Sequence, residues 1–203
     1  MSKNFQIIIV GVGGQGILTV SDILGTSAIK AGLKPIMSEV HGMAQRGGVV
    51  VTEMKIGDYY SPLIGDHSAD AILSFEPLEA YRALKKARKG AYIVTNNQPL
   101  VPPNVSIGKA EYPDIEDMFD KIKKSGFKFV SIPALQLANS AGTSRAGNVV
   151  MLGALSAVPN FVMSREEVES AISDRVSAKW LDINMKAFAL GYEEAERQLN
   201  KNE

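Results

Sequence analysis

Three glycines early in the chain have the spacing of a phosphate-binding loop. Gly11, Gly13 and Gly16 in the stretch "GVGGQGIL" follow the apolar run "FQIIIV" and precede residues with helical spacing. In such a loop the glycines let the backbone approach a pyrophosphate, and N–H groups at the helix start favour its negative charge. Glu39 ends the next predicted strand, where an acidic residue would bind ribose hydroxyls. These residues alone support NAD binding and a purely structural tight turn about equally.

A second segment rich in glycine and polar residues, "HGMAQRGG", follows the second predicted strand at positions 41–48. Its candidate binding residues are His41, Gln45, Arg46, Gly47 and Gly48. Loops at the carboxyl end of a parallel sheet are where open α/β folds bind ligands or partners. The guanidinium of Arg46 would meet a phosphate or carboxylate there, and the alternative is a solvated turn. The clustering of these residues near the first glycine loop favours a binding role.

Arg145 and Asn148 form a third candidate group. They precede the apolar stretch "VVMLGALSAV", which predicts a buried helix. The N-terminus of such a helix attracts anions, although a simple helix cap explains both residues as well. The only two histidines, His41 and His67, do not have metal-ligand spacing, and no nucleophile motif is present. We therefore predict neither a metal site nor a catalytic residue.

Composition excludes several function classes. The 203 residues carry 22 basic and 22 acidic side chains, and general nucleic-acid or membrane-surface binders are usually more basic. The chain has no cysteine, which excludes disulfides, thiol nucleophiles and cysteine-ligated iron–sulfur clusters. The longest apolar stretches are too short to span a bilayer, and we see no signal peptide. We expect a cytoplasmic protein with neither nucleic-acid nor membrane partners.

Strand-like and helix-like segments alternate along the chain. Apolar runs predict strands over residues 5–10, 34–37, 49–57, 69–75, 91–96 and 128–134. Helical spacing follows the first glycine loop and recurs over residues 77–90, 113–126 and most of 146–203. Such alternation produces a mostly parallel sheet with helices on both faces. We therefore predict a single three-layer, Rossmann-like α/β domain over residues 1–203, with a helical C-terminal region.

Three local features of the predicted helices can be compared with a structure. Ser164 and Glu167 have the spacing of a capping box at the start of a helix. An apolar stripe through Phe188 and Tyr192 predicts that the last helix docks on the core and does not form a coiled coil. The basic residues at 85–89 are expected at the solvated C-terminus of the helix that begins at position 77.

Four stretches together resemble the gamma-type module of the 2-oxoacid:ferredoxin oxidoreductases. They are "GVGGQGILTVSDIL", "SEVHGMAQRGGVVVTEMKIG", "SPLIGDHSADAILSFEPLEAYRAL" and "SRAGNVVMLGAL". The form "HGMAQRGG" in a separate chain of this length is most similar to the branch of the family that acts on arylpyruvates such as indolepyruvate. Several motifs in the right order are more specific than one glycine pattern. The family resemblance involves no NAD, so it favours the structural explanation of the glycine loop.

The resemblance implies oxidative decarboxylation of a 2-oxoacid with coenzyme A as co-substrate, which yields acyl-CoA, CO2 and reduced ferredoxin. That reaction needs thiamine diphosphate with Mg²⁺ and iron–sulfur clusters. The sequence has neither a G-D-G thiamine motif nor a cysteine, so the resemblance implies a large catalytic partner subunit that binds these cofactors. The present chain would bind none of them, would be inactive alone, and would contact the partner or an anionic ligand.

Other assignments are compatible with the same residues. The same module serves pyruvate, 2-oxoisovalerate and 2-oxoglutarate enzymes. A stand-alone NAD(P)-dependent oxidoreductase and a nucleotide-sensing or purely structural interaction module are the alternatives from other classes. The candidate partner- or ligand-binding residues are Gly11, Gly13, Gly14, Gln15, Gly16, His41, Gln45, Arg46, Gly47, Gly48, Arg145 and Asn148.

Overall fold

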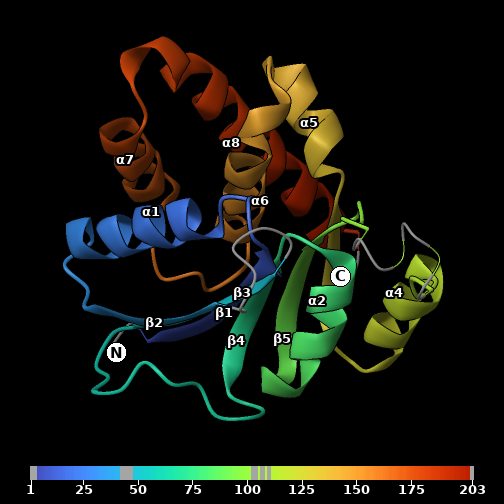
Figure 1. The fold of residues 1–203 in the computed structure, drawn as a ribbon. Helices are drawn as coiled ribbons and strands as arrows, with labels where there is room; N and C mark the ends of the chain where they lie inside the picture. The colour runs from blue at the N-terminus through green and yellow to red at the C-terminus, as the bar shows by residue number, and fades with distance from the viewer. Residues whose placement is uncertain (1–3, 42–47, 102–104, 106–107, 109–110, 202–203) are drawn as a thin grey trace.

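The computed structural model describes residues 4–41, 48–101, 105, 108 and 111–201, which form a six-stranded sheet covered by helices (Figure 1). The strands are β1 (Phe5–Val12), β2 (Pro35–His41), β3 (Val49–Ile56), β4 (Ala69–Ser74), β5 (Ala87–Asn96) and β6 (Lys128–Ile132). The helices are α1 (Ile17–Lys30), α2 (Pro77–Ala83), α4 (Ile115–Lys124), α5 (Ala134–Ala141), α6 (Gly147–Ser156), α7 (Arg165–Arg175) and α8 (Ala178–Leu199). Two short 3-10 helices are η1 (Leu84–Lys86) and η2 (Ser144–Ala146). The predicted three-layer α/β fold is confirmed.

Two kinds of pairing make up the sheet, whose strand order is β2-β3-β1-β4-β5-β6. β1, β4, β5 and β6 pair in parallel. β3 pairs antiparallel with both β1 and β2. The mostly parallel sheet is thus as predicted, but the third strand inserts between the first two. The apolar pattern of a strand does not reveal its neighbours, so this insertion is visible only in the structure.

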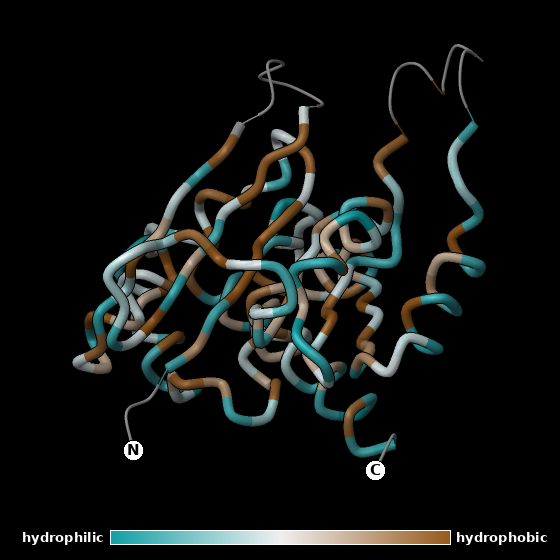
Figure 2. The backbone as a smooth tube through the Cα atoms, turned by 90° about the horizontal axis from the view of Figure 1, so that it is seen from below, coloured by the Kyte–Doolittle hydropathy of each residue, from teal (hydrophilic) through white to brown (hydrophobic). Residues whose placement is uncertain are grey.

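β1 is buried on both of its faces. Ile7 and Ile9 belong to the larger apolar cluster, which includes residues of α1, α5, α6, α7 and α8. Ile8 and Val10 belong to a second cluster with residues of α2 and α4. Figure 2 shows the hydrophobic residues concentrated in the central strands. Burial on both faces explains why β1 is a continuous apolar run and not an alternating one.

The α-helix predicted over residues 77–90 is wrong in its second half. α2 ends at Ala83, a 3-10 turn follows, and β5 begins at Ala87. Ala87 is buried, and the side chain of Arg88 forms an ion pair with Asp70 at 2.6 Å. These contacts with distant residues override the local helical pattern. Of the basic residues that the sequence places at a helix C-terminus, Lys85 and Lys86 lie in the last turn of the 3-10 helix, whereas Arg88 and Lys89 belong to β5, so the prediction is wrong for this second pair.

Two other helix predictions are confirmed. The side chain of Ser164 accepts the N–H of Glu167, and the carboxylate of Glu167 accepts the N–H of Ser164 at 2.6 Å, which forms the capping box of α7. The apolar stripe of α8 docks on the core, with Phe188 fully buried. In the part of the chain that the structure describes, no helix combines the length and the apolar character needed to cross a membrane.

α6 and α8 cross so closely that no side chain fits between them at two positions. A Cβ atom on Gly153 would lie 2.0 Å from the carbonyl oxygen of Phe188. A Cβ atom on Gly191 would lie 1.9 Å from the carbonyl oxygen of Val150. Glycine at both positions permits the crossing, which holds α6 in place with its first turn at the carboxyl edge of the sheet.

We expect Gly191→Ala to lower the free energy of unfolding by about 3 kcal/mol, because the added methyl group overlaps backbone atoms that cannot move unless the helices separate. Urea denaturation followed by circular dichroism measures this. Gly25→Ala in α1 is the control, since its Cβ would make an ordinary contact 3.8 Å from Met37 Cε. That control should gain up to about 1 kcal/mol. Equal stability of the two variants would contradict the close crossing.

Candidate functional site

A crevice of about 300 Å³ lies beyond the carboxyl ends of β1, β4, β5 and β6. In open α/β sheets this edge is where ligands and partners bind. Residues that line the crevice include Gly14, Gln15, Phe75, Asn96, Gln98, Leu100, Leu135, Arg145 and Asn148. Four residues predicted from the sequence therefore meet in one place, although two belong to the glycine loop and two lie far along the chain.

The glycine loop leaves β1 and turns into α1. Gly14 has φ +105° and Gly16 has φ +80°, conformations that L side chains rarely adopt. The N–H of Gly13 donates to the carbonyl of Gly48 at 2.9 Å. This bond ties the glycine loop to the start of β3 and places one predicted residue of the second loop beside the first.

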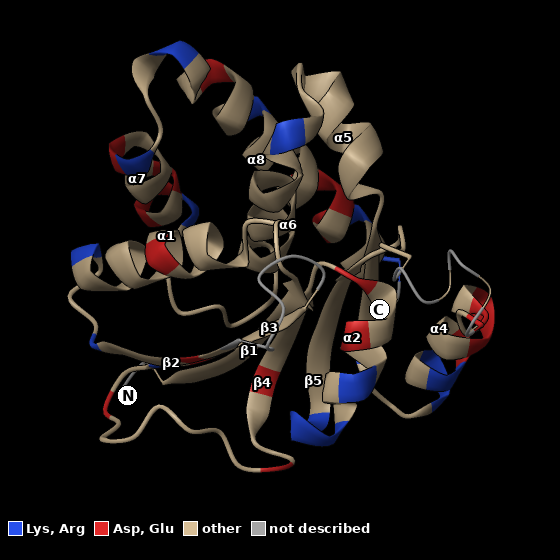
Figure 3. Cartoon of the chain, viewed as in Figure 1, with Lys and Arg blue, Asp and Glu red and all other residues tan. Residues whose placement is uncertain are grey.

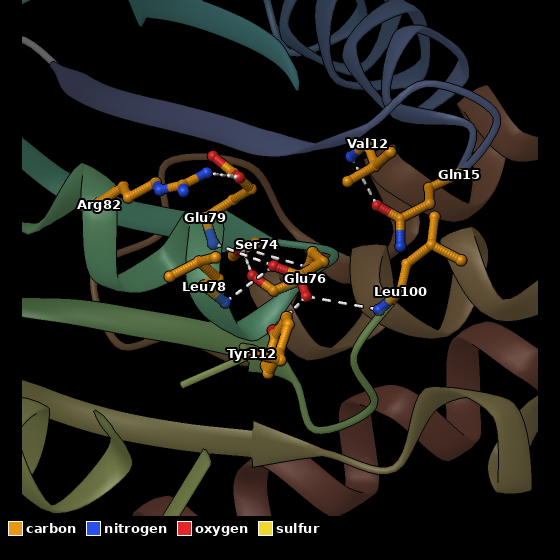
Figure 4. Close-up of polar contacts among 9 residues, drawn as sticks. All are labelled: Val12, Gln15, Ser74, Glu76, Leu78, Glu79, Arg82, Leu100 and Tyr112. Atoms are coloured by element: carbon orange, nitrogen blue, oxygen red, sulfur yellow. Dashed lines mark hydrogen bonds and ion pairs between the residues drawn. The ribbon is translucent and has the colours of Figure 1, made fainter. Parts of the chain in front are cut away.

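The side chain of Gln15 joins the ends of two strands. Its Oε1 accepts the N–H of Val12 at 2.7 Å, as Figure 4 shows, and its Nε2 donates to the carbonyl of Phe75 at 2.9 Å. A Cβ atom on Gly11 would lie 2.6 Å from Gln15 Oε1, so glycine at position 11 leaves room for this amide. Gln15 is therefore a structural brace, since both ends of its amide are bonded within the chain.

Asn148 packs against the last glycine of the loop. A Cβ atom on Gly16 would lie 2.6 Å from Nδ2 of Asn148. The sequence predicted these two residues as separate groups, and the structure brings them into contact. Arg145 lies beside them, exposed, and is the one charged residue among those described that line the crevice.

Three helices begin at the crevice without a side-chain cap on their N-cap residue. In α6 the N–H of Gly147 donates to the carbonyl of Ser144 and that of Val149 donates to Oδ1 of Asn148 at 2.9 Å, so the first turn of this helix is partly bonded. The N-cap residues of α1, α5 and α6 are Gly16, Pro133 and Ala146, and none accepts a hydrogen bond through its side chain. None of these helices has an acidic residue in its first turn, and α5 and α6 have no charged residue at all (Figure 3). The helix dipole and the N–H groups that remain unbonded make such ends positive. Together with the guanidinium of Arg145, they make the crevice suitable for a negatively charged group.

Part of the second predicted loop lies outside the described residues. This applies to Gln45, Arg46 and Gly47, and to the side chain of His41, whose backbone ends β2. Their binding role therefore stays a prediction.

The strand order differs from that of a dinucleotide-binding fold, although the glycine spacing is the same. Glu39 is paired with Thr52 of β3, and Thr52 is paired in turn with Ile9 of β1. Two strand spacings, about 10 Å, therefore separate Glu39 from β1. A dinucleotide-binding fold places the acidic strand directly beside the first strand. The acidic half of the NAD pattern is thus not formed here, and the glycines serve packing within the chain.

A buried acidic residue that the sequence reasoning missed lies beside the crevice. Glu76 follows β4, is only 2% exposed and caps α2. Its Oε2 accepts the N–H groups of Leu78 at 2.8 Å and Glu79 at 3.1 Å. Its Oε1 accepts the N–H of Leu100 at 3.4 Å and the hydroxyl of Tyr112 (Figure 4). Four donors thus compensate the burial of this carboxylate.

This network shifts the pKa values of its neighbours. Burial raises the pKa of the Tyr112 hydroxyl well above its ordinary value, and the hydrogen bond to Glu76 and its charge raise it further. The hydroxyl therefore stays protonated and donates to Glu76. Burial also raises the pKa of Glu79, while the guanidinium of Arg82, 2.6 Å from Glu79 Oε1, acts in the opposite direction. Arg82 thus compensates the second carboxylate at this helix start.

Comparison with known proteins assigns the chain to a family. The family model described as pyruvate ferredoxin/flavodoxin oxidoreductase matches residues 6–194. The chain belongs to this pyruvate ferredoxin/flavodoxin oxidoreductase family. The resemblance that its motifs carry is therefore confirmed.

Individual members of the family differ in their similarity to the chain. Indolepyruvate oxidoreductase subunit IorB of Thermococcus kodakarensis is 43% identical over 97% of this chain and 98% of its own length. The subunit of the same name from Pyrococcus horikoshii is 44% identical over 98% and 99%. A 2-oxoglutarate synthase subunit KorC of Methanocaldococcus jannaschii is 29% identical over 94% and 93%. The matches run along nearly the full length of each protein.

A solved structure shares the fold. The gamma subunit of a keto/oxoacid ferredoxin oxidoreductase from Geobacter sulfurreducens has a TM-score of 0.73 and 24% identity, and the match covers 95% of this chain and 96% of that one. The α/β arrangement of the pyruvate ferredoxin/flavodoxin oxidoreductase chain described here is thus also found in that subunit.

The sequence of this family member contains a partial signal for Glu76. An acidic residue directly before Pro77, itself at the first position of a helix, is consistent with an N-cap. Nothing local predicts the other partners, because Leu100 and Tyr112 are 24 and 36 residues away.

We expect Gln15→Ala to lower the free energy of unfolding by about 2 kcal/mol, because the Val12 N–H loses its partner and the Phe75 carbonyl keeps only the longer hydrogen bond from Asn96 Nδ2 at 3.2 Å. Thermal or urea unfolding of the isolated chain measures this loss. Gln136→Ala, on the exposed side of α5, is the matched control and should change stability by less than about 0.5 kcal/mol. If the two variants were equally stable, Gln15 would not brace the strands.

Proposed function

We propose that this chain is the small, non-catalytic subunit of a 2-oxoacid:ferredoxin oxidoreductase that acts on arylpyruvates such as indolepyruvate. The observation that carries the proposal is the full-length identity with indolepyruvate oxidoreductase subunits, which is clearly higher than the identity with the 2-oxoglutarate synthase subunit. Because all of these relatives match the chain over nearly its full length, the difference in identity supports the choice of substrate class.

The residues of this chain do not fit the cofactors that the proposed reaction needs. The chain has no cysteine to ligate an iron–sulfur cluster. Among the described residues, no three His, Asp or Glu side chains lie close enough together to hold a metal ion. We therefore assign thiamine diphosphate, Mg²⁺ and the iron–sulfur clusters to a large partner subunit, with coenzyme A as co-substrate and ferredoxin as electron acceptor.

In this proposal the crevice receives the partner subunit, or an anionic group such as a phosphate of coenzyme A. The helix N-termini without side-chain caps and Arg145 support an acidic or anionic occupant. Leu100 and Leu135 line the crevice and are exposed, and the exposed Trp180 lines a small pocket on which Arg145 also borders. Exposed aliphatic and aromatic anchors beside an arginine are typical of protein interfaces. We expect the 41–48 loop to contribute to the same contact.

The proposal extends to organisation and location. We expect residues 1–203 to form one gamma-type domain. A cysteine-free chain suits a reducing compartment, so we expect the complex in the cytoplasm.

Anaerobic purification of the tagged chain from its own host tests the subunit assignment. We expect a brown complex with a large cysteine-rich subunit that reduces viologen when given indolepyruvate and coenzyme A, because the partner carries the redox cofactors. The separated small chain should show no turnover. Faster turnover with pyruvate or 2-oxoglutarate would overturn the substrate class. A colourless chain that is recovered alone and binds NADH would overturn the subunit assignment.

We expect Arg145→Ala to weaken binding of the partner subunit, or to raise the KM for coenzyme A, by about tenfold, because it removes the positive side chain of the crevice. Surface plasmon resonance and steady-state kinetics of the reconstituted complex measure these parameters. Arg175→Ala is the control: Arg175 ends α7, and its ion pair with Asp22 lies outside the crevice. That control should stay within about twofold. If Arg145→Ala behaved like the control, the crevice would not be the contact site.

A further inference from the structure

Glu76 occupies a helix N-cap position, but its side chain does more than cap α2. Ser, Thr, Asp and Asn are the usual N-cap residues, since a short side chain reaches the nearby N–H groups. The longer side chain of Glu76 uses Oε2 for the N–H groups of Leu78 and Glu79. Its other oxygen, Oε1, is left for Leu100 and Tyr112, which belong to a different segment.

Oε1 of Glu76 holds both ends of the connection between β5 and α4. Leu100 lies shortly after β5, and Tyr112 lies shortly before α4. Closing such a connection costs conformational entropy, which hydrogen bonds to a charged acceptor offset. The hydroxyl of Ser74 donates to the carbonyl of Glu76 at 2.6 Å and so fixes the backbone at this position (Figure 4).

The start of this connection forms one wall of the crevice. Gln98 and Leu100 of this connection line the crevice, which Arg145 also lines. Asn96 fixes the beginning of the wall, because its Nδ2 donates to the carbonyl of Gln98 at 3.2 Å. Beyond Gln98, the hydrogen bond from the Leu100 N–H to Glu76 holds the wall in place.

We propose that Glu76 is a positioning residue for the crevice: it sets the place of the wall formed by residues 98–100 and thereby the binding of the group that occupies the crevice. This inference rests on the proposed function, in which the crevice is a contact site. Glu76 does not line the crevice itself, so it acts through Leu100.

Glu76→Gln in the complex with the partner subunit tests the proposal. The carbonyl oxygen of glutamine can cap α2, but its NH2 group then faces the N–H of Leu100, and two donors meet. Arg145→Ala is expected to raise either the dissociation constant for the partner subunit or the KM for coenzyme A. We expect Glu76→Gln to raise the same one of these two parameters about tenfold. The Leu100 amide should exchange hydrogen about tenfold faster, while the amides of Leu78 and Glu79 should not change.

Two further variants separate positioning from a general loss of stability. Ser164→Ala removes the cap of α7, away from the crevice, and should leave both binding parameters within about twofold. Tyr112→Phe removes one donor to Oε1 and leaves the cap of α2 intact. Tyr112→Phe should raise the dissociation constant or KM that Glu76→Gln raises, by about threefold. It therefore tests the proposal even if Glu76→Gln does not fold.

The outcomes distinguish this inference from the proposed function. If Arg145→Ala weakens binding but Glu76→Gln and Tyr112→Phe do not, Glu76 is only a helix cap, and the crevice is still the contact site. If none of the three variants weakens binding, both proposals fail. If Glu76→Gln weakens binding but Arg145→Ala does not, Glu76 acts outside the crevice, and this result also overturns the inference.

Discussion

The amide of Gln15 is the interaction on which the carboxyl edge of the sheet depends. It accepts a hydrogen bond from the end of β1 and donates one to the residue after β4, so it joins two central parallel strands where the glycine loop leaves the sheet. The amide fits only because Gly11 has no side chain. The start of α1 is held at this point, and Asn148 packs on its N-cap residue. The glycine spacing thus serves contacts within the chain.

Two regions of opposite electrostatic character lie close together at this edge. The crevice carries Arg145 and the N-termini of three helices that have no side-chain cap, and these features favour an anion. Beside it, Glu76 and Glu79 are buried carboxylates. Their charges are compensated by helix N–H groups, a tyrosine hydroxyl and Arg82. Because these acids are bonded to donors of their own, they oppose an anion in the crevice less than open carboxylates would.

Membership of the pyruvate ferredoxin/flavodoxin oxidoreductase family bears on what the carboxyl edge of the sheet can do. The chemistry of that family requires redox cofactors, and a chain without cysteine lacks the usual cluster ligands. What the chain offers is a shaped surface: a crevice with positive helix ends, exposed apolar residues around it, and a wall held by a buried carboxylate. Such a surface is suited to completing an assembly.

The sequence by itself determined the family and the elements whose causes are local. The run Ile7–Val10 predicts a central strand because both faces of that strand are apolar, and the capping box of Ser164 and Glu167 needs partners only three residues apart. The glycine spacing, the apolar stripes and the order of the motifs could likewise be recognised, because they too are patterns of the sequence itself. About the candidate site, the sequence named the residues Gly14, Gln15 and Arg145 but not their arrangement.

Only the tertiary structure decided the features that depend on distant partners. It placed β3 between β1 and β2, which separates Glu39 from the glycine loop. It ended α2 at Ala83 and, after a 3-10 turn, began β5 at Ala87, where burial and the ion pair of Arg88 with Asp70 favour a strand. It also brought Tyr112 to Glu76. Hydropathy patterns report burial, and motifs of fixed spacing report short-range hydrogen bonds. Strand neighbours and buried polar contacts depend on groups that meet only when the chain has folded.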